Sequence, residues 1–110
     1  MSLLARDGRE IIQGTFGGTA LEETYDSSIS GSTEITLNAA TTIIEVTSFA
    51  KGLFLKWGTS DAASTDWDHC VAQDTTRLFI VPVDTSTGAR YTAFNVIEQA
   101  ASAAVAVSEF

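Results

Sequence analysis

The sequence predicts an all-β domain, either a β-sandwich or a small jelly roll, with a glycine-rich N-terminal arm. Three observations support this prediction. The chain has 110 residues, which suits one domain, and 45% of them are apolar against 18% charged, a balance typical of a folded core. Short runs of β-branched and aromatic residues recur about every ten residues between turn-forming residues. No segment has the length and period of a convincing helix.

Residues 1–32 differ in composition from the rest of the chain. They hold five of the eight glycines, at positions 8, 14, 17, 18 and 31. Glycine loses much conformational freedom when it is ordered, so this density indicates turns or an extended arm, in which short strands over residues 10–16 and 20–25 are possible. We therefore divide the chain into an arm of residues 1–32 and a β-sandwich domain of residues 33–110.

The sandwich domain begins with a cleanly alternating run, Thr33–Leu37, and continues in β-prone runs to the C-terminus. We expect seven strands, over residues 33–37, 41–49, 53–57, 67–72, 76–83, 90–98 and 100–110. The alanines of the last run would suit a helix, but Val105 and Val107 at a spacing of two favour a strand. Lys51-Gly52 indicates a hairpin turn. Pro82 lacks a backbone donor and therefore places its strand at a sheet edge or ends it.

Several of these strands carry apolar residues on both faces. The residues in excess are Phe54, Phe79, Val81 and Ile97. A two-layer sandwich needs only one apolar face per sheet, so the surplus predicts contact with a neighbouring subunit or with an arm that lies across the outside. The alternative is a few ordinary exposed hydrophobic residues. We expect a homo-oligomer, a dimer or a trimer, or a state bound to a host assembly.

The charge of the chain argues against two classes of partner. Fourteen Asp and Glu residues stand against six Lys and Arg, a net charge of −8, and the cations are scattered singly. Nucleic acids and anionic membranes both need a basic patch, so we expect neither as a partner. No apolar run has the length of a signal peptide or a membrane span, and we expect a soluble protein without an ordinary export signal. Cys70 is the only cysteine, which excludes an intramolecular disulfide.

The sequence contains no recognisable catalytic or cofactor motif. His69 and Cys70 are adjacent, and neighbouring residues of a strand point to opposite faces, so they do not suit a catalytic pair. Asp61, Asp66 and Asp68 are candidates for a Ca²⁺ site, but they lack the spacing of an EF-hand loop, and aspartates also serve as turn formers. We expect no enzyme activity, no catalytic residues and no cofactor.

Aromatic rings are the remaining candidates for contacts. Trp57 continues the apolar face of Leu53 and Leu55, which places it in the core. Trp67 lies between two aspartates in a polar loop and is a candidate for contact with a ligand or a partner subunit. The candidate partner contacts are Phe16, Phe54, Trp67 and Phe79.

Four segments in the second half of the chain have a pattern of strand and loop residues that is similar to that of a known group of proteins. They are the run Phe-Leu-Lys-Trp-Gly-Thr (Phe54–Thr59), the polar loop Ser60–Asp66, the run Phe-Ile-Val-Pro (Phe79–Pro82) and the C-terminal run Ala103–Glu109. Through these segments, residues 52–110 resemble small virion-associated proteins of tailed bacteriophages. The shared features are residue patterns of strands and of a polar loop, and they contain no catalytic signature.

This resemblance implies a capsid decoration (cement) protein or another head or tail accessory protein, built on a β-sandwich or jelly roll and assembled as a dimer or trimer. Its partners would be the major capsid protein or other virion proteins, and its location the virion, after assembly in the host cytoplasm. The alternative is a carbohydrate- or receptor-binding module of a phage tail or fibre that uses Trp67, Tyr91 and the acidic loops. A small enzyme is a third hypothesis.

Overall fold

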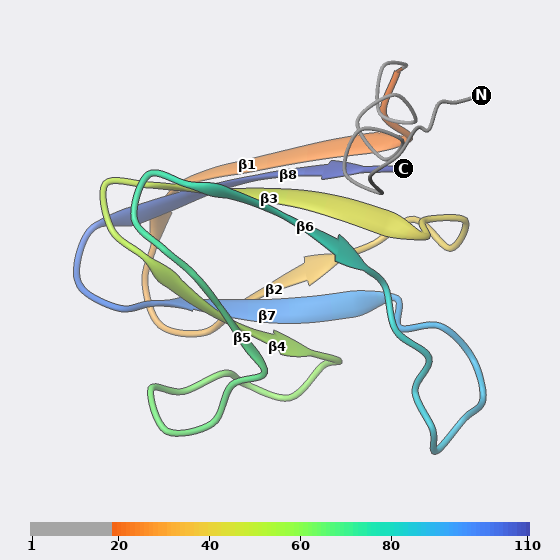
Figure 1. The fold of residues 1–110 in the computed structure, drawn as a ribbon. Coiled ribbons are helices and arrows are strands. Elements are labelled where there is room, and N and C mark those ends of the chain that lie inside the picture. Colours follow the sequence, from red (N-terminus) through yellow and green to blue (C-terminus); the bar gives the residue numbers. More distant parts are fainter. Residues whose placement is uncertain (1–18) are drawn as a thin grey trace, which may run out of the picture.

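The computed structural model describes residues 19–110, which form two four-stranded antiparallel sheets packed face to face, a β-sandwich (Figure 1). The first sheet has the order β1-β8-β3-β6 and the second the order β2-β7-β4-β5. The strands are β1 Glu22–Ile29, β2 Thr33–Thr36, β3 Ile43–Phe49, β4 Leu53–Trp57, β5 His69–Val71, β6 Thr76–Ile80, β7 Ala93–Glu98 and β8 Ala103–Glu109. The predicted all-β fold is confirmed.

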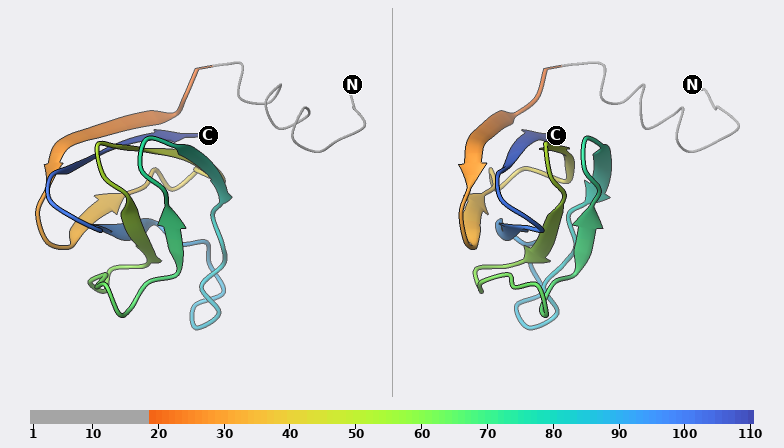
Figure 2. Two further views of the ribbon diagram at one scale, coloured as in Figure 1. Left: turned by 60° about the vertical axis from the view of Figure 1, so that its left-hand side comes forward. Right: turned by 90° about the vertical axis from the view of Figure 1, so that its left-hand side faces the viewer.

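The strands pair in a nested order. The first pairs with the eighth, the second with the seventh, the third with the sixth and the fourth with the fifth. Pairing of β3 with β8 and of β4 with β7 then completes the two sheets. This is the strand order of a jelly roll, in which a long folded ribbon wraps into two facing layers. Figure 2 shows the two layers from two further directions.

The inner faces of the two sheets form the core because the strands alternate between apolar and polar residues. In β3, Ile44 and Val46 are fully buried, and in β4, Leu53 and Leu55 are fully buried. Val105 and Val107 of β8 are also buried and lie beside the β3 residues on the inner face of the first sheet. The predicted C-terminal strand is therefore confirmed. Burial of each such side chain contributes about 1.5–3 kcal/mol, which makes the inner layer the main source of stability.

Trp57 joins the two layers at one end of the core. Its ring meets Phe79 of the first sheet edge to face at 6.2 Å and Phe94 of the second at 5.8 Å. His69 also packs against it edge to face at 6.3 Å, and Tyr91 stacks on it at 6.2 Å. The predicted core position of Trp57 is therefore confirmed.

The sandwich begins earlier in the chain than the division at residue 33 predicts. Residues 22–29, placed in the arm by their neighbouring glycines, form β1 and pair with β8 along the edge of the first sheet. The strand considered possible over residues 20–25 overlaps the first half of β1, whereas the polar run around Asp26 gives no strand signal, because an edge strand with one solvated face needs few apolar residues. Residues 1–18, with the strand considered at 10–16 and the candidate contact Phe16, lie outside the described residues.

The predicted hairpin at Lys51-Gly52 is wrong. The turn connects β3 to β4, but these strands belong to different sheets, so the chain crosses from one layer to the other there. Gly52 lies close to a neighbouring backbone, where a Cβ would stand 3.0 Å from the carbonyl oxygen of Val71. The expectation for Pro82 is confirmed, because β6 ends at Ile80 and is an edge strand.

Glu109 is a fully buried carboxyl group on the inner side of β8. Its Oε1 accepts hydrogen bonds from the backbone N–H of Asn38 and from the hydroxyl of Thr41, both at 2.7 Å. Among the described residues, Oε2 has no hydrogen-bond partner. The side chain therefore ties the connection between β2 and β3 to the C-terminal strand.

Replacing Glu109 by alanine should lower the free energy of unfolding by about 2–4 kcal/mol, because it leaves the buried hydroxyl of Thr41 and the partly buried N–H of Asn38 without this acceptor and opens a cavity. Glu109→Gln keeps an acceptor at Oε1 and should cost less. Urea denaturation of both variants measures the difference. Equal losses in the two variants would show that the hydrogen bonds to Asn38 and Thr41 contribute nothing.

Candidate interaction surface

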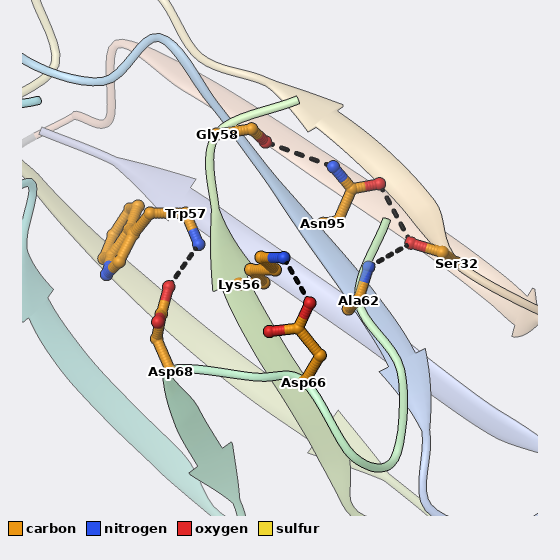
Figure 3. Close-up of polar contacts among 8 residues, drawn as sticks. All are labelled: Ser32, Lys56, Trp57, Gly58, Ala62, Asp66, Asp68 and Asn95. Atoms are coloured by element: carbon orange, nitrogen blue, oxygen red, sulfur yellow. Dashed lines mark hydrogen bonds and ion pairs between the residues drawn. The ribbon is translucent and has the colours of Figure 1, made fainter. Parts of the chain in front are cut away.

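The outer face of the second sheet is covered by the chain itself. Loop 58–68, drawn in green below the sheet in Figure 1, folds back over β4 and β7 and is fastened by Asn95. Asn95 is 2% exposed; its amide donates to the carbonyl oxygen of Gly58 at 3.1 Å, and its Oδ1 accepts from the hydroxyl of Ser32 at 3.0 Å. The Ser32 oxygen in turn accepts the backbone N–H of Ala62 at 2.9 Å (Figure 3).

Two further contacts hold the end of this loop. Asp68 accepts the backbone N–H of Trp57 at 2.9 Å, and Lys56 pairs with Asp66 at 2.6 Å (Figure 3). The Asp66 carboxylate is largely exposed, so this ion pair contributes only about 0–1 kcal/mol. Trp67 stacks on Phe54 at 5.0 Å between ring centroids, which places the indole over the outer side of β4. Apolar residues on this outer face therefore pack against the chain's own loop.

The outer face of the first sheet has no such cover, and no described segment lies over it (Figure 1). We call it the open face; by strand alternation it comprises Glu23, Tyr25, Ile43, Glu45, Thr47, Phe49, Thr76, Leu78, Ile80, Ala104, Ala106 and Ser108. Only two of these twelve residues are charged, and both are acidic. The rest are apolar, small or hydroxyl-bearing, which is the composition of a contact surface with low desolvation cost.

Exposed large side chains lie toward both edges of the open face. Tyr25 of β1 is 64% exposed and meets Phe49 of β3 edge to face at 6.1 Å. At the opposite edge Ile80 is 75% exposed. Between them the hydroxyls of Thr47 and Thr76 are hydrogen bonded at 2.7 Å. Exposed apolar groups of this kind on one sheet face mark a candidate interaction surface.

The candidate contacts inferred from the sequence fall in different places. Phe54 and Trp67 are brought together on the covered face, as described above. Phe79 is only 6% exposed and belongs to the core, as does Val81, so the expectation of an apolar outer surface at these two residues is wrong. Leu78 and Ile80 instead form the outer side of β6. Tyr25 was missed because its strand lacks a clean apolar period.

The three candidate Ca²⁺ ligands are not gathered into a site. Asp66 is paired with Lys56, and Asp68 is bound to the backbone of Trp57. Among residues 19–110, no group of three or more His, Cys, Asp or Glu side chains is placed to hold a metal ion.

His69 and Cys70 lie side by side in β5 but point in opposite directions. His69 is paired with Leu55, and its ring packs at 5.0 Å from Phe79 on the inner side. Cys70 is paired with Phe54 on the outer side. The imidazole and the thiol therefore cannot act as a catalytic pair, because they stand on different faces of the sheet.

A hollow of about 370 Å³ lies beside the loop between β6 and β7. Its charged lining residues are Asp84 and Arg90. The hydroxyl and the backbone N–H of Ser86 both donate to Asp84, at 2.7 and 2.9 Å, and hold the pKa of that carboxyl below its usual value. Asp84 thus stays ionised near neutral pH and serves as a turn former, with its carboxylate held by Ser86.

In the part of the chain that the structure describes, no helix is long and apolar enough to cross a membrane. Comparison of the chain with protein-family models, with curated proteins and with solved structures gives no match.

Replacing Asn95 by alanine should free loop 58–68 from the covered face. We expect a loss of about 1–3 kcal/mol in the free energy of unfolding, because the partly buried hydroxyl of Ser32 and carbonyl of Gly58 lose their partner. Amide hydrogen exchange at Ala62 should also become faster. Lys56→Ala is the matched control, since loss of the exposed ion pair should change stability by less than about 1 kcal/mol. Unchanged exchange at Ala62 in Asn95→Ala would refute the fastening role of Asn95.

Proposed function

We propose that this chain is a structural protein of a tailed-phage particle, a capsid decoration protein that attaches to the head and stabilises it. The observation that carries the proposal is the open face, an uncovered sheet surface with exposed apolar side chains and only two charges. Its partner is the major capsid protein or another virion protein. The protein is located in the virion, after assembly in the host cytoplasm.

Two further observations support this function. The nested strand order is shared with viral capsid domains and with lectin domains. This analogy of fold favours capsid attachment and carbohydrate binding equally and does not decide between them. The resemblance of residues 52–110 to small virion proteins favours the first. The His–Cys geometry and the scattered aspartates also offer no arrangement for chemistry among the described residues.

The composition of the open face suggests how attachment would work. Burial of Tyr25, Phe49 and Ile80 supplies a favourable term of about 25 cal/mol per Å² of apolar surface removed from water. The two acidic residues, Glu23 and Glu45, require a cationic or hydrated partner group opposite them, since a buried unpaired charge is costly. The capsid surface that fits this face is therefore apolar at its centre, with basic residues placed near the two glutamates.

The double variant Tyr25→Ala, Phe49→Ala should weaken binding to heads of the encoding phage about tenfold or more, because aromatic side chains dominate interface energies. Trp67→Ala, which removes a similarly exposed ring from the covered face, should bind normally. Co-sedimentation of the full chain with undecorated heads measures both. Equal binding by both variants would refute the open face as the attachment surface.

A second candidate function is carbohydrate binding. It is favoured by Trp67, whose ring is 41% exposed and is held rigid by stacking on Phe54. Such a platform can stack on a sugar ring. Binding on a glycan array that is abolished by Trp67→Ala and unaffected by the double variant of Tyr25 and Phe49 would support this function over capsid attachment.

A further inference from the structure

The strand β6 has one side along which no strand pairs with it among residues 19–110, and three of its five residues point their backbone N–H and C=O groups to that side. It is the last strand of the first sheet and pairs with β3 from Thr76 opposite Thr47 to Ile80 opposite Ile43. The flanking bonds run from Val81 N–H to the oxygen of Thr42 and from Ser48 N–H to the oxygen of Thr75. Because bonding alternates along an antiparallel pair, Arg77 and Phe79 bond to β3, whereas Thr76, Leu78 and Ile80 point their N–H and C=O groups away from the sheet.

The same three residues present their side chains on the open face. Ile80 is the most exposed large apolar residue of the described chain, and Leu78 is half-buried beside it. Ile43, Leu78, Ile80, Phe79 and His69 line a hollow of about 410 Å³ at this edge. The inner side of β6 is anchored, since Phe79 packs on Trp57 and His69. An exposed, apolar and rigid edge strand is a ready template for another strand.

The two edges of the first sheet differ in charge. The other edge, β1, carries Glu22, Glu23 and Asp26, and its register shifts between Asp26 and Ile29. Like charges and irregular pairing are features that block edge-to-edge association. From residue 75 to residue 83 the chain has no acidic residue, and its only charge is the cation Arg77. In a chain of net charge −8, β6 is therefore the edge of the first sheet that better tolerates a second copy of itself.

We propose that two copies of this chain join through their β6 edges, antiparallel about a two-fold axis beside Leu78, into one continuous eight-stranded sheet. In this register Leu78 stands opposite Leu78 of the second copy, and Thr76 stands opposite its Ile80. All three are residues whose backbone groups point outward, so the pairing makes six main-chain hydrogen bonds. Strand addition of this kind gives affinity through the backbone and specificity through alternate side chains.

The charges are compatible with this register. Arg77 faces Phe79 of the second copy, so the two cations are not directly opposed. Its guanidinium is already engaged by the carbonyl oxygen of Cys70 at 2.6 Å and by the ring of its own Phe79 at 4.8 Å. The nearest acid on the open face is Glu45, next to Leu78. The two Glu45 residues are three strand spacings apart, about 14 Å, beyond the screening length of about 8 Å in physiological salt.

Analytical ultracentrifugation of the full chain, with no phage particle present, tests this association separately from the proposed function. We expect a reversible monomer–dimer equilibrium that tightens as NaCl is raised, because salt screens the repulsion between two acidic chains. Leu78→Lys places two like charges at the axis and should weaken dimerisation about tenfold or more. Tyr25→Lys, the same charge change on the opposite edge strand, should leave it unchanged. Circular dichroism establishes that both variants are folded.

Cysteine cross-linking tests the register in a Cys70→Ser background. Opposed residues of a hydrogen-bonded pair have Cα atoms about 5.5 Å apart, within disulfide range. Leu78→Cys should therefore cross-link to its own copy under mild oxidation. Thr76→Cys alone and Ile80→Cys alone should not, since each lies about 14 Å from itself across the axis, but a mixture of the two should cross-link.

Three outcomes would overturn the proposal. The first is a chain that sediments as a monomer up to millimolar concentration. The second is a dimer that Leu78→Lys leaves intact or that Tyr25→Lys disrupts, which would place the interface elsewhere. The third is self-cross-linking of Thr76→Cys without cross-linking of Leu78→Cys. None of these outcomes bears on capsid attachment, which is measured separately by co-sedimentation.

Discussion

The arrangement of this protein depends on one constraint, the burial of the inner faces of two four-stranded sheets against each other. Trp57 lies between the two sheets, where its ring contacts Phe79 of the first sheet and Phe94 of the second. Because Phe79 is held there, the side of β6 that meets the core is settled. Leu78 and Ile80 must then stand outside, on the edge of the sheet. The interior thus determines which apolar groups reach the surface.

The two outer faces are unequal because only one is covered by the chain itself. Asn95 holds loop 58–68 over the second sheet through Gly58 and Ser32, and Trp67 covers part of Phe54. An excess of apolar residues on that sheet therefore serves the protein's own packing. The first sheet has no equivalent loop among the described residues, so its exposed side chains are available to another molecule. This asymmetry distinguishes the two outer faces of the molecule.

The polar residues of the chain are used for structure. The carboxylates of Asp26 and Asp84 accept the backbone N–H groups of Ser28 and Ser86, two residues later in each case, at 3.0 and 2.9 Å. Aspartate favours this use because its short side chain reaches nearby backbone donors. The high acid content thus reflects turn formation and a negative surface. The proposed function accordingly depends on surface shape and strand edges.

The sequence by itself determined the all-β class, the bounds of β4 and the alternation that places Ile44 and Val46 in the core, because strand period is a local property. It also separated the two sides of β6. Only the tertiary structure decided that Phe79 turns inward, that Lys51-Gly52 crosses between sheets, and that the polar segment Glu22–Ile29 is an edge strand. The physical reason is that pairing and burial are long-range. Alternation shows which side chains share a face, whereas distant strands decide what that face meets.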